Sequence, residues 1–235
     1  MNFLVYVRLI SMSIIGLLPA SGKAERILGL PKFAIPISDK ETLISWHVKM
    51  LKEVCDDVII TTRREWVPIL ELLELPAKIV VKEPSTLSNT IRETLSEVKG
   101  SVFFGMPDTA ILGNSVNPYV NLLNCDREIN LGLFNCPPSL MGKVGQVLYK
   151  EGEVRDVVDK IQNCNYPHMW GNIFFRNYSN QLDLGTNTPS TEINNWIRSG
   201  VSIGGVFNDG QYFDVGSFEG LKELLIAIKN ESGDL

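Results

Sequence analysis

Residues 14–32, IIGLLPASGKAERILGLPK, constrain the fold of this chain more than any other segment. Residues 14–18 form an apolar run closed by Pro19, the pattern of a short strand that is buried on both faces of a parallel sheet. A turn of small residues, 19–22, follows at once. Three cations lie close behind it: Lys23, Arg26 and Lys32. Gly22 lets the backbone approach an anion, free N–H groups donate to it, and cations neutralise its charge. The segment therefore predicts a nucleotide site at one end of a sheet.

Strand and helix signals alternate in the first part of the chain and give way to strands later. The apolar patterns predict strands at 14–18, 58–62, 78–81 and 101–106, with helices near 40–54, 65–73 and 87–98. Strands are then expected at 131–136, 145–149, 154–160 and 170–175, followed by a helix near 191–199, a strand near 201–207 and a closing helix capped by Ser217. This order predicts an α/β fold class, with a single doubly wound, mostly parallel mixed sheet that is Rossmann-like, flanked by helices and β-rich in its second half.

We expect residues 14–235 to form one domain, because no repeat, low-complexity tract or linker interrupts them. Its halves are 14–125, around the nucleotide turn, and 126–235, around a second substrate. Residues 1–13 have two interpretations. A signal peptide is one, with Ala20 imitating a cleavage site. An N-terminal extension is the simpler one, with Met12 as the natural start, because Arg8 interrupts the apolar run and cleavage near residue 20 would remove the first strand.

Composition excludes several classes of partner. The net charge of −5 argues against a nucleic-acid binder, which would normally carry a basic face. No stretch beyond the N-terminal one approaches the length of a membrane span, so we expect no membrane partner. Four cysteines without a C-x-x-C pair, with only two histidines, do not form a zinc constellation, and free thiols in a reducing cytoplasm are expected.

Two carboxylates stand out because of the segments that precede them. Asp108 directly follows an uncharged strand in GMPDTAI, so it should lie at the carboxyl end of that strand, where open α/β sheets bind ligands. It could equally cap the next segment. Asp214, in YFDVGS, could simply lie near the N-terminus of the closing helix, where negative charge is favoured.

The order of these features resembles that of the sugar-1-phosphate nucleotidyltransferase family, the NDP-sugar pyrophosphorylases. In that family a buried strand enters a Gly-rich turn, which is followed by an Arg and then by a Pro-Lys pair. The corresponding residues here are Leu18-Pro19-Ala20-Ser21-Gly22, Arg26 and Pro31-Lys32. The family's Asp after the central strand corresponds to Asp108, and its late Trp-x-Asp-x-Gly-Thr segment corresponds to residues 212–217. The resemblance covers nearly the whole chain from residue 14. Ala24 departs from it, since the family usually has a second glycine there.

The resemblance implies roles for individual residues. It makes Asp108 and Asp214 the ligands of a catalytic Mg²⁺, an ion that prefers hard oxygen donors and usually takes one or two protein carboxylates. Arg26, Lys32 and Lys160 become catalytic cations. The nucleotide would be bound by Leu18, Pro19, Ala20, Ser21, Gly22, Lys23, Glu83 and Ser88. The sugar phosphate would be bound by Gly132, Asp159, Lys160 and Gly171. Asp159 stands where the family has Glu.

The resemblance therefore implies an Mg²⁺-dependent enzyme that joins a nucleoside triphosphate to a sugar 1-phosphate, giving an NDP-sugar and pyrophosphate. A cytidylyltransferase acting on a phosphorylated alcohol, such as an isoprenoid precursor or choline phosphate, would use the same fold. A nucleotide-binding regulatory module without turnover is the alternative from another class; Ala24 and Asp159 favour it, whereas the pair of carboxylates counts against it. Family members are often oligomers, so the resemblance also allows a homo-oligomer.

Overall fold

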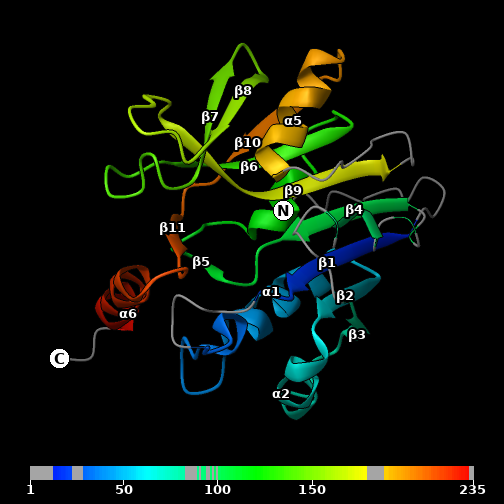
Figure 1. Ribbon diagram of the computed structural model, residues 1–235, viewed down its shortest axis with the longest axis vertical. Coiled ribbons are helices and arrows are strands. Elements are labelled where there is room, and N and C mark those ends of the chain that lie inside the picture. Colours follow the sequence, from blue (N-terminus) through cyan, green and yellow to red (C-terminus); the bar gives the residue numbers. More distant parts are fainter. Residues whose placement is uncertain are drawn as a thin grey trace, which may run out of the picture.

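The computed structural model of the chain describes residues 13–22, 29–82, 89, 91–93, 96, 98, 100–178 and 188–232. Nine strands of this part form one sheet in the order β3-β2-β1-β4-β9-β6-β10-β8-β7 (Figure 1). Their bounds are β1 Ile14–Ala20, β2 Asp57–Thr62, β3 Lys78–Val81, β4 Gly100–Gly105, β6 Ile129–Asn135, β7 Gly145–Lys150, β8 Glu153–Asp159, β9 His168–Tyr178 and β10 Ile203–Phe207. A separate two-stranded ribbon pairs β5, Thr109–Leu112, with β11, Gln211–Asp214.

The first four strands of the sheet order are parallel, as expected for apolar runs that are covered on both faces. Strand β1 pairs in parallel with β2 on one side and with β4 on the other, and β2 pairs in parallel with β3. Every residue of β4 is buried. This parallel block brings the ends of β1 and β4 to the same edge of the sheet, so the segments that follow these two strands lie side by side there.

The expectation of a mostly parallel sheet is wrong. Strand β9 runs antiparallel to β4, β6 and β7, and β8 runs antiparallel to β7 and β10; β6 with β10 is the parallel pair of this half. Because β7 pairs with both β8 and β9, the strands β9, β6, β10, β8 and β7 close on themselves. The fold is therefore a mixed α/β fold in which a parallel block joins a closed, largely antiparallel arrangement through β9.

Helices cover both faces of the sheet. Their bounds are α1 Leu43–Lys52, α2 Val67–Leu72, α4 Pro118–Leu122, α5 Pro189–Arg198 and α6 Phe218–Ser232, with short 3-10 helices at Lys32–Ala34 and Arg64–Trp66. One core cluster contains apolar residues of α1, α2 and α4 against β1, β2 and β4, and another contains Ile193 and Trp196 of α5 against β6, β8 and β9. Each fully buried aliphatic or aromatic side chain in these clusters contributes roughly 1.5–3 kcal/mol.

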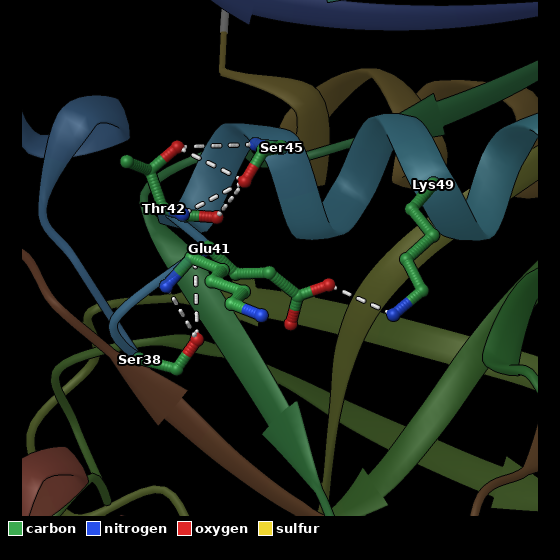
Figure 2. A network of polar contacts seen from close by, with 6 residues as sticks. Ser38, Glu41, Thr42, Ser45 and Lys49 are labelled. Atoms are coloured by element: carbon green, nitrogen blue, oxygen red, sulfur yellow. Dashed lines mark hydrogen bonds and ion pairs between the residues drawn. The ribbon is translucent and has the colours of Figure 1, made fainter.

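Polar contacts fix the start of α1 (Figure 2). The side chain of Thr42 accepts a hydrogen bond from the Ser45 backbone N–H, and the Ser45 hydroxyl oxygen accepts one from the Thr42 N–H at 2.7 Å, which makes a capping box. Ser38 Oγ accepts from the N–H of Glu41, whose carboxylate pairs with Lys49 Nζ at 2.8 Å. The first turn of α1 is thereby anchored, which fixes the side chains that this helix presents to the core.

Most sequence-predicted elements are present with shifted ends. The segment expected to be helical at 65–73 begins as a 3-10 turn before α2, and the closing helix follows Ser217, whose hydroxyl accepts from the Gly220 N–H. Strands β5 and β11 and helix α4 were not expected. The apolar residue Leu224 packs α6 against the β5–β11 ribbon, and Figure 1 shows this helix beside β11.

Gly171 lies at an irregularity in β9, where the register with β6 shifts between Gly132 and Leu133. A Cβ there would lie 2.7 Å from ring atoms of both Phe134 and Tyr212, closer than real contacts allow. We expect Gly171→Ala to lower the free energy of unfolding by about 1–3 kcal/mol, because two packed rings must move. Urea denaturation measures this, with Gly22→Ala as the control, since a Cβ at residue 22 meets no atom within 4 Å. Equal midpoints for the two variants would contradict the close approach.

Candidate functional site

Asp108 and Asp214 are brought together by the β5–β11 ribbon. Asp108 follows β4 and directly precedes β5, while Asp214 ends β11 and pairs in register with Thr109. The backbone N–H of Val215 donates to the Asp108 carbonyl oxygen at 3.0 Å, so Asp108 lies beside the residue that follows Asp214. Asp214 Oδ1 also accepts from the Gly216 N–H at 2.8 Å. The ribbon thus brings the backbones of two aspartates that are far apart in the sequence next to each other.

Lys32 contacts Asp108. Its Nζ lies 3.3 Å from Asp108 Oδ2, and the two side chains are 18% and 38% exposed. Lys32 starts the 3-10 helix Lys32–Ala34, whose Phe33 is buried in the core, so the ammonium group is held by a packed element. Two of the residues that the sequence singled out, Lys32 and Asp108, are therefore in contact.

The small-residue turn after β1 is anchored through its carbonyl groups. Three consecutive carbonyl oxygens accept hydrogen bonds from side chains that follow or end β2: Ala20 from Thr62 Oγ1 at 3.1 Å, Ser21 from Arg63 Nε at 2.7 Å and Gly22 from Trp66 Nε1 at 3.3 Å. In a trans peptide the N–H points opposite to the C=O. The N–H groups of Ser21 and Gly22 therefore point away from the end of β2, as an anion-binding turn requires.

The remaining predicted nucleotide-binding residues have varied positions. Leu18 is fully buried in the core, and Pro19 is half-buried beside Thr61 of β2. Lys23, Arg26, Glu83 and Ser88 lie outside the described residues, as does Ala24. No sequence signal singles out Arg63 or Trp66, because their anchoring role depends on the parallel register of β1 with β2.

The predicted sugar-phosphate residues lie on the second half of the sheet. Gly132 of β6 pairs with Asn172 of β9, which also pairs with Gly105 at the end of β4, so this point adjoins the carboxyl end of the parallel block. A Cβ at Gly132 would overlap the Asn172 amide, which explains the glycine. Asp159 ends β8, and Lys160 follows it with an exposed side chain and a φ of +54°, a left-handed conformation that is uncommon for lysine.

A buried glutamine holds the loops around Lys160. Gln146 of β7 is fully buried; its Nε2 donates to the carbonyl oxygens of Cys164 and Tyr166, at 3.3 and 2.9 Å, and its Oε1 accepts from the Gly142 N–H at 2.8 Å. The Tyr166 hydroxyl donates to Asp156 of β8 at 2.8 Å, and this bond raises the pKa of the tyrosine to about 12. Both segments that flank Lys160 are therefore fixed to the closed half of the sheet.

His47 of α1 contacts the backbone of Thr109, the residue that follows Asp108. It is buried, with its Nδ1 2.7 Å from the Tyr119 hydroxyl and its Nε2 3.0 Å from the Thr109 carbonyl oxygen. A carbonyl oxygen only accepts, so Nε2 carries the proton and Nδ1 accepts from the tyrosine. Burial lowers the pKa of His47 to about 4, against the opposing effects of the Thr109 hydrogen bond and the Asp108 charge. The imidazole is neutral at physiological pH.

Three further observations concern metal-ligand clusters, cysteines and the hydropathy of the helices. In the part of the chain that the structure describes, no group of three or more His, Cys, Asp or Glu side chains is arranged to hold a metal ion. Cys55, Cys125, Cys136 and Cys164 are free thiols, as expected. None of the described helices is long and apolar enough to cross a membrane.

The low pKa of His47 predicts a pH-dependent stability. Its ordinary value is 6.5, so between pH 6.5 and about 4 the unfolded chain binds a proton that the folded protein excludes, and stability falls as pH falls through this window. From pH 7 to pH 5 this residue should remove about 2 kcal/mol from the free energy of unfolding. Urea denaturation at both pH values measures this loss, and His47→Gln should lack it. The same loss in both proteins would contradict the buried neutral imidazole.

Solved structures share this fold at low sequence identity. A Bacillus anthracis protein assigned as a glucose-1-phosphate thymidylyltransferase, in complex with sucrose, has a TM-score of 0.78 at 15% identity, over 93% of this chain and 96% of that one. The UTP-bound UGPase from Acinetobacter baumannii has a TM-score of 0.71 at 16% identity, over 94% of each chain. A UDP-glucose pyrophosphorylase complexed with UDP-glucose has a TM-score of 0.72 at 17% identity, over 94% of this chain and 100% of that one.

No protein-family model and no curated protein sequence matches the chain. The structural likeness nevertheless extends along nearly the whole of both partners in each comparison. The chain therefore has the mixed α/β fold of the sugar-1-phosphate nucleotidyltransferases, as its sequence resemblance predicted.

Proposed function

We propose that the protein is a nucleotidyltransferase that joins a nucleoside triphosphate to a sugar 1-phosphate and releases pyrophosphate. The observation that carries the proposal is the convergence of Lys32, Asp108 and Asp214 at one sheet edge. This edge also carries the anchored turn after β1, because β1 and β4 are adjacent parallel strands. A cation, two carboxylates and an amide-lined turn are the groups that a triphosphate and its counter-ion need.

The two carboxylates suit Mg²⁺ by their chemistry. This ion usually takes one or two protein carboxylates and completes its coordination with phosphates and water, so a larger cluster of protein ligands is not required. Asp108 Oδ2 already accepts a hydrogen bond from the ammonium group of Lys32, which supports its capacity to bind a cation. Asp108 and Asp214 would hold the ion, and when bound it supplies positive charge for the α-phosphate.

The chain's own residues would bind and orient the two substrates. The N–H groups of Ser21 and Gly22, with the cations Lys23 and Arg26 that follow them in the sequence, would hold the triphosphate, and Lys32 would neutralise its charge. Lys160 would hold the phosphate of the sugar phosphate, one of whose oxygens attacks the α-phosphorus in line. The bond from the α-phosphorus to the bridging oxygen breaks, and its electron pair leaves with pyrophosphate. Positioning and charge neutralisation account for most of such catalysis.

We expect Asp108→Asn and Asp214→Asn each to lower turnover by about 100-fold or more, because each removes a negative charge from the proposed ion site. The measurement is Mg²⁺-dependent pyrophosphate release with each of the common nucleoside triphosphates, paired with sugar 1-phosphates and with phosphorylated alcohols. Asp57→Asn is the matched control, since Asp57 is exposed at the start of β2, the opposite end of a parallel strand. If turnover occurred only with a phosphorylated alcohol, that alcohol would be the acceptor in place of the sugar 1-phosphate. Nucleotide binding without turnover across the panel would instead identify a binding module.

Lys160→Ala should raise the KM for the acceptor phosphate by about 10- to 100-fold, the effect of losing one hydrogen bond to a charged group. The KM for the nucleoside triphosphate should stay within about twofold of the wild-type value. Steady-state kinetics with each substrate varied in turn separates the two. Lys150→Ala is the control, because Lys150 is an exposed lysine at the far end of the β7–β8 hairpin. A parallel rise in both KM values would contradict the assigned role.

A further inference from the structure

We propose that His47 and Tyr119 are positioning residues that hold the Asp108–Thr109 turn in place from beneath. Neither residue lies among the groups that would touch substrate, and neither has a role in the proposed reaction so far. The inference deepens the proposed function and rests on it for its kinetic test. Its structural test stands independently.

The contact runs through the backbone next to Asp108. Nε2–H of His47 donates to the Thr109 carbonyl oxygen at 3.0 Å, and the Tyr119 hydroxyl donates to Nδ1 at 2.7 Å. His47 and Tyr119 are 1% and 0% exposed, so water does not compete for these bonds. A chain of hydrogen bonds therefore runs from α4 through α1 to β5.

The same turn is held by three further hydrogen bonds, to two other residues. The Thr109 N–H and hydroxyl both donate to the Met106 carbonyl oxygen, at 3.1 and 2.8 Å. The Val215 N–H donates to the Asp108 carbonyl oxygen from β11. With His47 on the Thr109 carbonyl, main-chain groups on both sides of the Asp108 side chain are engaged, which restricts the directions that its carboxylate can take.

The surrounding sequence makes room for this arrangement. A Cβ at Gly105, the last residue of β4, would lie 2.1 Å from the Tyr119 hydroxyl, so the tyrosine reaches His47 because this residue is glycine. The Asn117 side chain caps α4 and donates to the Met50 carbonyl oxygen of α1 at 2.8 Å, which holds the two helices together at a second point. The capping box at Thr42 fixes the start of α1, one turn before His47 (Figure 2).

An apolar residue would fill the position of His47 at lower cost, because burying a polar ring is unfavourable unless its hydrogen bonds are made. What histidine adds is a direction for the Thr109 carbonyl, and residues that orient metal-binding groups typically change metal affinity or activity by about 10- to 100-fold when they are replaced. Replacing His47 should therefore disturb the Asp108–Thr109 turn by more than the loss of global stability explains.

The structural test is hydrogen–deuterium exchange of the full-length protein, read by mass spectrometry on peptides covering residues 106–112 and 211–216. His47→Leu should speed exchange in both peptides, because the Thr109 carbonyl and the Tyr119 hydroxyl lose their partner. Leu51→Ala is the matched control: Leu51 is fully buried on the same helix but packs beneath β1 and β2. Urea is added so that the two variants have equal global stability, and the increase in exchange for His47→Leu must then exceed that for Leu51→Ala. Equal exchange in the two variants would overturn the inference.

The kinetic test compares the Mg²⁺ requirement of the enzyme with its KM for the acceptor. His47→Leu should raise the Mg²⁺ concentration for half-maximal rate by about 10-fold or more, with the KM for the acceptor within about twofold. His47→Gln should recover most of the loss, because its amide N–H and carbonyl oxygen supply the same donor and acceptor. A glutamine variant as impaired as the leucine variant would overturn the positioning role.

Tyr119→Phe removes only a hydroxyl and keeps the packed ring, so it tests the same chain of hydrogen bonds if His47→Leu does not fold. It should speed exchange in the 106–112 peptide to a smaller extent, and no change there would count against the inference. If Asp108→Asn were as active as Asp57→Asn, the proposed function would fail, while the exchange data would still decide whether His47 holds the turn.

Discussion

Strand β9 is the element on which the rest of the structure depends. It runs antiparallel between β4 of the parallel block and β6 of the second half, and its first residues also pair with β7. Two glycines allow this close packing, Gly132 against the Asn172 amide and Gly171 between two aromatic rings. Because β9 is shared, the turn after β1 and the loop after β8 have a fixed relation to each other, which a reaction between two separately bound substrates requires.

Polar side chains hold main-chain groups in place around the proposed site. Gln146 holds the segments around Lys160, Arg63 holds the Ser21 carbonyl of the turn after β1, and His47 holds the Thr109 carbonyl beside Asp108. Gln146 and His47 belong to regular elements and are buried, Arg63 directly follows β2 and is half-buried, and each group that they hold lies at the edge of a loop. Loops that carry function are kept in place by rigid elements in this way.

The parts of the fold that local patterns encode were predictable from the sequence. The apolar runs of β1, β2 and β4 identify buried strands, whereas the anion site inferred from small residues followed by cations stays a prediction. Direction of pairing is not a local property, so the antiparallel run of β9 could not be read from its residues. The β5–β11 ribbon was missed for a related reason: each strand has four residues, too few to show a period, and their pairing joins distant segments. His47 lies on the apolar face of α1, where its spacing resembles that of a core residue.

The ribbon also has a consequence for the time at which the site can form during synthesis. Thr109 pairs with Asp214, so 105 positions of sequence separate the two sides of the carboxylate pair. The parallel block and the turn after β1 are built from residues that leave the ribosome before β11 and the helix α6 that packs on the ribbon. A nascent chain that stops before residue 211 therefore carries the turn after β1 and Lys32 without the second carboxylate. The pair of carboxylates is completed only when translation has passed β11.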